Sequence, residues 1–327
     1  MNPGLEFLEQ CAAETGFRVA ALEKVVRLGD VLADVGRHPL LGPSLALKGG
    51  TALNLAFGRP TRLSVDLDFN YIANVERQAM LTARPTIEST VLGLGRRLGY
   101  RVQQSSDEFA GRKLYLNYRS VLGHEDRIEI DLNYLMRSPI GQPEVRSLWQ
   151  PGGLDSPKAM LVSPMELAIG KLLALLDRSA ARDVWDVSAL PEELRRLVRS
   201  EGFRPWFIGM AATLPNLLPT YTRDRFAARV TETAIEQRLV PMLIGGASAR
   251  AGGLVESAWT VVAPFLDLAD GERSYLDAFN AGEVRAELLF GPDVQSAALL
   301  AAHPAIQWRL QNIRDHRKRQ RLSSGPA

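Results

Sequence analysis

The chain has 327 residues, 46% of them hydrophobic and 23% charged, which is the composition of an ordinary globular protein. Its formal net charge of +2 excludes a strongly basic protein, so a nucleic-acid surface would have to come from local clusters of Lys and Arg. The single cysteine, Cys11, excludes an internal disulfide and a cysteine-rich zinc site. Without a recognisable signal peptide or a run of about 18 apolar residues, we expect a cytoplasmic protein with no membrane partner.

The first half of the chain predicts a mixed sheet flanked by helices. Apolar residues at helical spacing predict one helix over 5–36, and a short strand at 45–47 leads into a glycine turn. The other expected elements of this half are a helix over 51–57, strands over 63–71, 113–119 and 127–135, and a helix over about 77–97.

The second half of the chain predicts helices. Gly- and Pro-rich breaks at 141–143 and 151–157 suggest a linker. Ser163 and Glu166 then favour a helix start, as N-cap and N3 residues around a proline at N1. We therefore expect an α+β fold with a sheet domain over 1–154 and a mainly helical domain over 155–327.

Two acids lie on one face of the strand expected at 63–71. Apolar residues alternate there with Ser64, Asp66 and Asp68, and the period of two places both carboxylates opposite the core face. Side chains at this spacing suit a pair of Mg²⁺ ions about 3.5–4 Å apart. The alternative is a solvated strand face with incidental acids.

The strand expected at 127–135 repeats this alternation. It would present a third carboxylate to the same metal ions, for which we prefer Asp131 over Glu129. Magnesium binds few carboxylates together with water and phosphate oxygens, so two or three acids suffice.

A glycine turn precedes the acids. Gly49 and Gly50 allow a close approach of the backbone to a ligand, and the N–H groups at a helix start favour phosphate. Thr51 adds a hydroxyl for the γ-phosphate or for capping its own helix. The alternative is an ordinary turn between a strand and a helix.

These motifs together carry a family resemblance. Gly49-Gly50-Thr51 followed by Asp66-x-Asp68 resembles the G-G/S…D-x-D motif of the DNA-polymerase-β-like nucleotidyltransferase superfamily, although many members carry Ser at the Thr51 position. The longer arrangement, with Lys48 before the turn and Arg62-x-Ser64 before the acids, resembles the AbiEii/AbiGii toxin family. The resemblance implies a nucleotidyltransferase-fold catalytic domain with the following site. Asp66, Asp68 and Asp131 would hold Mg²⁺ or Mn²⁺, and Lys48, Gly49, Gly50, Thr51, Arg62 and Ser64 would contact the NTP.

A later segment extends the resemblance to about residues 45–190. Lys171, Arg178 and Arg182-Asp183-x-x-Asp186 resemble the K…R…R-D-x-x-D segment of AbiEii toxins. This implies a phosphate contact for Lys171 and an active-site acid at Asp183, with Asp186 less clearly assigned. Periodicity alone favours a surface lysine at Lys171, whose stem covers the helix, and a simple i, i+4 pair between Arg182 and Asp186.

The resemblance implies a toxin of a bacterial toxin–antitoxin or abortive-infection system that defends against phage. It would transfer NMP from an NTP to an acceptor hydroxyl, with a tRNA 3′ end as the implied acceptor, and its cognate antitoxin need not bind it. Rival hypotheses are transfer to a small molecule or a protein, and a nucleotide- or RNA-binding module without catalysis. The basic residues of 309–321 would contact RNA or complement a helix C-terminus.

Overall fold

The computed structural model describes residues 3–106, 108, 110–245, 247 and 249–323, with side chains as far as residue 320. The chain forms two compact units, one made of Met1–Leu167 with Val230–Leu254 and the other of Ala168–Arg229 with Val255–Ala327. No helix in these described ranges is long and apolar enough to cross a membrane.

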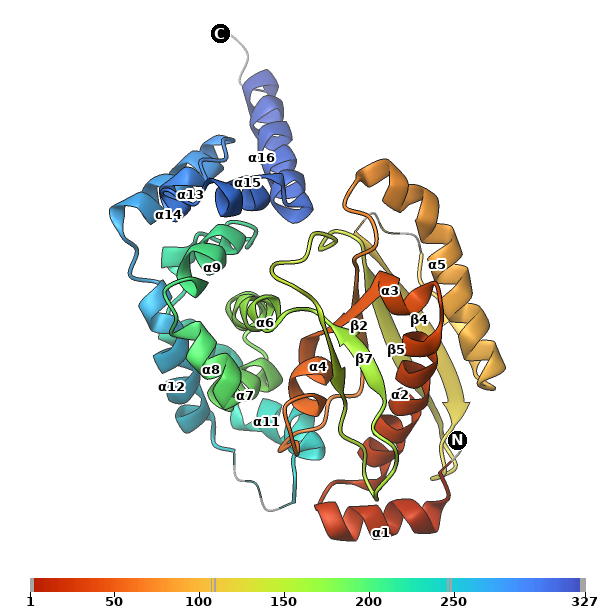
Figure 1. Ribbon diagram of the computed structural model, residues 1–327. Coiled ribbons are helices and arrows are strands. Elements are labelled where there is room, and N and C mark those ends of the chain that lie inside the picture. Colours follow the sequence, from red (N-terminus) through yellow and green to blue (C-terminus); the bar gives the residue numbers. More distant parts are fainter. Residues whose placement is uncertain (1–2, 107, 109, 246, 248, 324–327) are drawn as a thin grey trace. The chain divides into compact units, whose positions relative to one another are not determined.

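The first unit contains a mixed sheet of strand order β3-β4-β5-β2-β1-β7-β6 (Figure 1). Its strands are β1 (Leu45–Lys48), β2 (Leu67–Tyr71), β3 (Arg101–Gln104), β4 (Gly111–Arg119), β5 (Glu125–Asn133), β6 (Glu144–Ser147) and β7 (Lys158–Leu161). β2 is parallel to β5 and β1 is parallel to β7, whereas the other neighbours are antiparallel. The mixed α/β architecture expected from the sequence is confirmed.

The first unit also contains helices. They are α1 (Leu5–Thr15), α2 (Val19–Arg37), α3 (Leu41–Ser44), α4 (Gly49–Leu55), α5 (Arg77–Arg97) and α11 (Glu232–Arg238). α2 and α5 lie against the sheet (Figure 1). β4 and β5 alternate buried and more exposed residues, so one face of this antiparallel pair joins the core and the other does not.

The second unit is helical. Its elements are α6 (Pro164–Arg178), which begins in the first unit, α7 (Ala181–Ser188), α8 (Glu192–Val198), α9 (Phe203–Ala211), α10 (Arg223–Arg229), α12 (Ala251–Val262), α13 (Asp270–Ala281), α14 (Glu287–Phe290), α15 (Val294–Ala302) and α16 (Pro304–Ser323). Phe203, Phe207 and Phe265 pack edge-on and tilted against one another in its core.

The single helix expected over 5–36 is wrong, because the chain turns at Gly16. This glycine ends α1 in the left-handed region, at φ 77°, and its N–H donates to the carbonyl of Ala12. Its own carbonyl accepts from the N–H of Gly245, so the turn also anchors a distant segment of the same unit.

The strand expected over 63–71 begins only at Leu67. The preceding segment pairs elsewhere: the N–H of Leu63 donates to Met242 and the N–H of Ile244 donates to Thr61. Asp66 therefore precedes the strand, while Asp68 lies within it.

The segment interpreted as a linker belongs to the sheet. β6 lies within 141–157, and β7 follows it directly. Both strands have four residues, and β6 is a polar edge strand, so neither produces a clear apolar alternation. The two compact units accordingly do not divide at 154/155 as the sequence suggested.

Candidate active site

A row of four charged residues crosses the middle of the sheet. Lys48 on β1 is the register partner of Asp68 on β2, and Asp68 is the partner of Asp131 on β5. On the other side, Asp131 is the partner of Lys113 on β4. Register partners point to the same face of a sheet, so the row presents two adjacent carboxylates flanked by two cations.

The two carboxylates repel each other in the absence of a cation. Burial raises the pKa of Asp131 above its ordinary value. The charge of Lys48 opposes this rise, and the negative charge of Asp68 adds to it. Adjacent, half-buried carboxylates are the donors that Mg²⁺ prefers, so this pair fits the metal implied by the sequence. Within the described ranges, no group of three or more His, Cys, Asp or Glu side chains is arranged to hold a metal ion.

The glycine turn lies against this row because it lacks side chains. Gly49 has φ 72°, and a Cβ there would lie 2.4 Å from Oδ2 of Asp68. A Cβ at Gly50 would lie 2.7 Å from Oγ of Ser64 and 3.1 Å from Nη2 of Arg62. The left-handed backbone at Gly49 favours glycine there, and the absence of a side chain at Gly50 lets Ser64 and Arg62 lie beside the turn.

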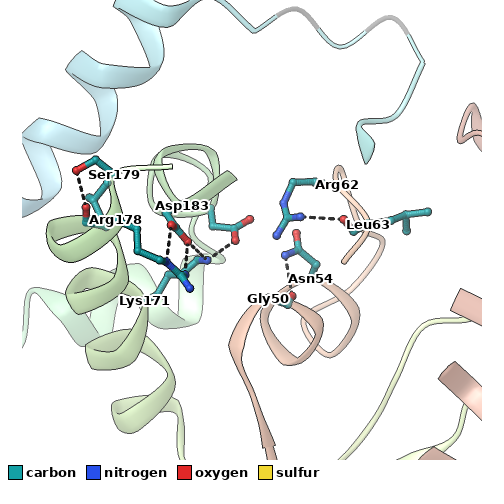
Figure 2. Close-up of polar contacts among 10 residues, drawn as sticks. Gly50, Asn54, Arg62, Leu63, Lys171, Arg178, Ser179 and Asp183 are labelled. Carbon is teal, nitrogen blue, oxygen red and sulfur yellow. Dashed lines mark hydrogen bonds and ion pairs between the residues drawn. The ribbon is translucent and has the colours of Figure 1, made fainter. Parts of the chain in front are cut away.

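Two hydrogen bonds fix the loop around the turn (Figure 2). Nδ2 of Asn54 donates to the carbonyl of Gly50 over 2.8 Å, and Nη1 of the buried Arg62 donates to the carbonyl of Leu63 over 2.9 Å. The Arg62 guanidinium thus holds its own loop as well as lying beside the turn.

Thr51 has a partner that the sequence did not indicate. Its fully buried hydroxyl donates to the backbone carbonyl of Asp66 over 2.5 Å. The alternative in which Thr51 caps its own helix is wrong, since the N-cap residue of α4 is Lys48 and no side-chain cap hydrogen bond forms there. Thr51 joins the start of α4 to the segment that carries Asp66.

In the helical unit, Lys171 is buried rather than on the surface. Its Nζ lies 3.1 Å from Oδ1 of Asp183 and 2.6 Å from Oδ2 of Asp186. Arg178 donates to both oxygens of Asp183, over 3.2 Å from Nε and 2.9 Å from Nη2 (Figure 2). The four residues form an ion-pair cluster of zero net formal charge that joins α6 to α7.

The cluster depends on a tight connection between these helices. Ser179 adopts φ 50°, and its buried hydroxyl donates to the carbonyl of Leu175 (Figure 2). Arg229 donates to the carbonyls of Asp177 and Arg178 at the end of α6. These contacts satisfy backbone carbonyls in the last turn of α6. The chain then reverses direction into α7, which brings Asp183 next to Lys171.

Sequence reasoning missed a buried acid next to the row. Glu166 accepts from Nδ2 of Asn70 over 2.6 Å and from the N–H of Ile140 over 2.9 Å. Burial raises the pKa of Glu166 to about 7. The sequence assigned this residue to helix capping. The structure confirms the cap at Ser163, whose Oγ accepts from the Glu166 N–H, but the Glu166 carboxylate lies elsewhere. In the sequence, Asn70, two residues after Asp68 on the same strand, is the residue that could have indicated a buried polar partner here.

Three arginines of 309–321 donate to backbone carbonyls of the helical unit. Arg309 donates to the carbonyl of Leu214, Arg314 to that of Gly282 and Arg317 to that of Ala281. These bonds favour the structural alternative for the three arginines, and the side chain of Arg321 lies outside the described residues.

Comparisons with known proteins agree with this geometry. The family model described as nucleotidyl transferase AbiEii toxin, type IV toxin–antitoxin system, matches residues 30–243. Among solved structures, the chain is similar to MenT4, a nucleotidyltransferase toxin from Mycobacterium tuberculosis H37Rv. The TM-score is 0.56 with 16% identity over 91% of this chain and 98% of that one, which shows a shared fold. No functionally curated protein matches the chain significantly. Because the family model covers more than half of the chain, the chain belongs to the AbiEii family of nucleotidyltransferase toxins of type IV toxin–antitoxin systems.

Proposed function

We propose that this nucleotidyltransferase transfers a nucleoside monophosphate from an NTP to the 3′ hydroxyl of an RNA, with tRNA as the acceptor. The observation that carries the proposal is the Asp68–Asp131 pair beside the turn formed by Gly49 and Gly50. A glycine turn beside two carboxylates suits a triphosphate with its divalent cation.

Three residues of the row, Asp68, Asp131 and Lys48, have roles in this proposed reaction, together with the residues around the turn. Asp68 and Asp131, with Asp66 on the adjoining segment, would hold Mg²⁺ or Mn²⁺, and the ion would neutralise phosphate charge. Gly49 and Gly50 let Asp68, Ser64 and Arg62 lie close to the turn that would receive the triphosphate, and Lys48 places a cation at its edge. Ser64 and Arg62 line the same turn, while Thr51 holds the Asp66 segment in place. The chain thus contributes mainly positioning and charge neutralisation.

We infer that Lys171 and Asp183 act as positioning residues. Each already has charged partners in the cluster, and both side chains are buried. A direct phosphate contact by Lys171 would take its ammonium away from Asp183 and from the buried Asp186, which lies 2.6 Å from it, and this loss is costly.

A labelled-NTP assay tests the proposal. Purified protein is incubated with each α-labelled NTP, Mg²⁺ and total RNA, and in parallel with RNA-free cell protein or small-molecule extract. We expect label on RNA, and a loss of that label for Asp68→Asn. Label only on protein or on a small molecule would reject the RNA acceptor, and tight nucleotide binding without transfer would reject catalysis.

The type IV system implies a cognate antitoxin, and we infer that it counteracts the toxin without a stable complex. Co-expression followed by purification of the tagged toxin tests this. Stoichiometric co-purification of the antitoxin would contradict the inference.

A further inference from the structure

The open face of the β4–β5 pair continues directly from the charged row. Along β4, the residues on this face after Lys113 are Tyr115, Asn117 and Arg119. They lie opposite Glu129, Arg127 and Glu125 of β5. From Lys113 to Arg119 the strand extends about 20 Å, at about 3.4 Å per residue. A continuous polar surface therefore leads away from Asp131.

On this surface an arginine side chain stacks on an aromatic ring. The guanidinium of Arg127 lies over the Tyr115 ring, 4.5 Å from its centroid. A second stack on β4, Arg27 over Tyr118, lies on the opposite face and is buried under α2. The Tyr118 stack thus belongs to the core, whereas Arg127 is exposed and Tyr115 is half-buried.

The charges of this surface favour an anionic partner. Its two acids are already paired, Glu129 with Lys113 and Glu125 with Arg101. Arg119 and Arg127 are exposed and have no ion-pair partner among the residues that the structure describes. Two uncompensated cations beside an accessible stack suit the phosphates and bases of a single strand, because bases stack on aromatic rings and on guanidinium planes.

We propose that this surface, made of Lys113, Tyr115, Arg119 and Arg127 and named here the β4–β5 platform, binds the single-stranded end of the acceptor RNA. The proposal deepens the proposed function and rests on its RNA acceptor. Tyr115 and Arg127 stack a base, while Arg119 and Lys113 contact phosphates on the way to Asp131.

Binding of a labelled single-stranded RNA of about ten nucleotides, measured by anisotropy without NTP, tests the platform. Tyr115→Ala should weaken binding roughly 5- to 100-fold, as expected for loss of one stacked base, and Tyr115→Phe should retain it. Arg127→Ala should weaken binding and lower the slope of log K against log salt by about 0.7. The control is Arg37→Ala, which removes an exposed arginine from α2, on the other side of the sheet.

Unchanged RNA binding in both Tyr115→Ala and Arg127→Ala would overturn the platform. That result would also be the one expected if this face binds a protein instead of RNA. If Tyr115→Ala lowers the Tm, Arg127→Ala decides, because its side chain is exposed. The proposed function is tested separately. If the wild-type protein binds RNA through Tyr115 but transfers no nucleotide to it, the platform stands and the RNA acceptor is rejected. If both variants transfer nucleotide to RNA with an unchanged KM for RNA, the RNA acceptor stands and the platform is rejected.

Discussion

Asp68 and Asp131 are register partners on the parallel strands β2 and β5, although 62 residues separate them in the sequence. Parallel pairing brings the two carboxylates onto one face with no intervening side chain. Burial and the charge of Asp68 both raise the pKa of Asp131. The protein therefore places like charges together at a cost to folding, which is expected where a cation is to be bound.

Asp131→Asn should abolish nucleotide transfer without lowering the Tm of the metal-free protein. Because the folded state raises the pKa of Asp131, its ionised form destabilises the fold at neutral pH, and the neutral amide removes that cost. Mg²⁺ with NTP should raise the Tm of the wild type and not that of the variant. Thermal melts with and without Mg²⁺–NTP measure both effects.

Glu129→Gln is the matched control, because Glu129 lies two residues earlier on the same face of β5. It should retain the Tm increase with Mg²⁺–NTP in the absence of RNA. Loss of that increase in Glu129→Gln, with retention in Asp131→Asn, would exchange the roles assigned to these two acids.

Gly49→Ala should lose both stability and transfer, whereas Gly153→Ala should lose stability alone. The two glycines have φ 72° and 70°, so alanine costs about 1–2 kcal/mol of backbone strain at either position. Only at Gly49 does the new Cβ reach the carboxylate of Asp68; at Gly153 nothing lies within 4 Å. Denaturant unfolding and transfer assays on both variants check this. Equal activities would show that the close approach at Gly49 has no functional role.

Local patterns in the sequence predicted the central strands of the sheet and the glycine turn, whereas the family resemblance implied the roles of the candidate site residues. The alternations around Asp68 and Asp131 correspond to β2 and β5, and the glycines before α4 form the predicted turn. The sequence did not predict which strands pair, so it could not identify Lys113 as a neighbour of Asp131. It also missed the burial of Lys171, because a lysine in a helix shows no pattern that distinguishes a buried ion pair from a solvated face.

Glu166 should make the stability of the fold fall as pH rises from about 4.5 to 7. Its folded-state pKa of about 7 exceeds the ordinary 4.5, so the folded state binds more protons in this interval. This difference in pKa between the folded and unfolded states lowers the free energy of unfolding by about 3 kcal/mol at neutral pH. Glu166→Gln should flatten this dependence. Oδ1 of Asn70 has no hydrogen-bond partner among the described residues, so a flipped Asn70 amide can accept from the new amide.

Urea unfolding of the wild type and Glu166→Gln across pH 4.5–7.5 measures this contribution. The variant should gain stability relative to the wild type as pH rises. A constant difference over the interval would show that Glu166 ionises with its ordinary pKa in the folded protein.

Lys171→Met should destabilise the protein strongly, by about 3–5 kcal/mol, because it leaves Asp183 and Asp186 buried without their shared cation. The matched control is Arg178→Met, since Arg178 is half-exposed and its loss leaves Lys171 on Asp183; it should cost about 1 kcal/mol or less. Adding Asp186→Asn to Lys171→Met should restore part of the lost stability, because it removes the buried carboxylate that lay 2.6 Å from the lost ammonium, whereas Asp183 keeps Arg178. Chemical denaturation of the three variants, together with KM for NTP, separates a positioning role from a phosphate contact. A Lys171→Met protein with wild-type stability and a raised KM for NTP would assign the lysine directly to the nucleotide.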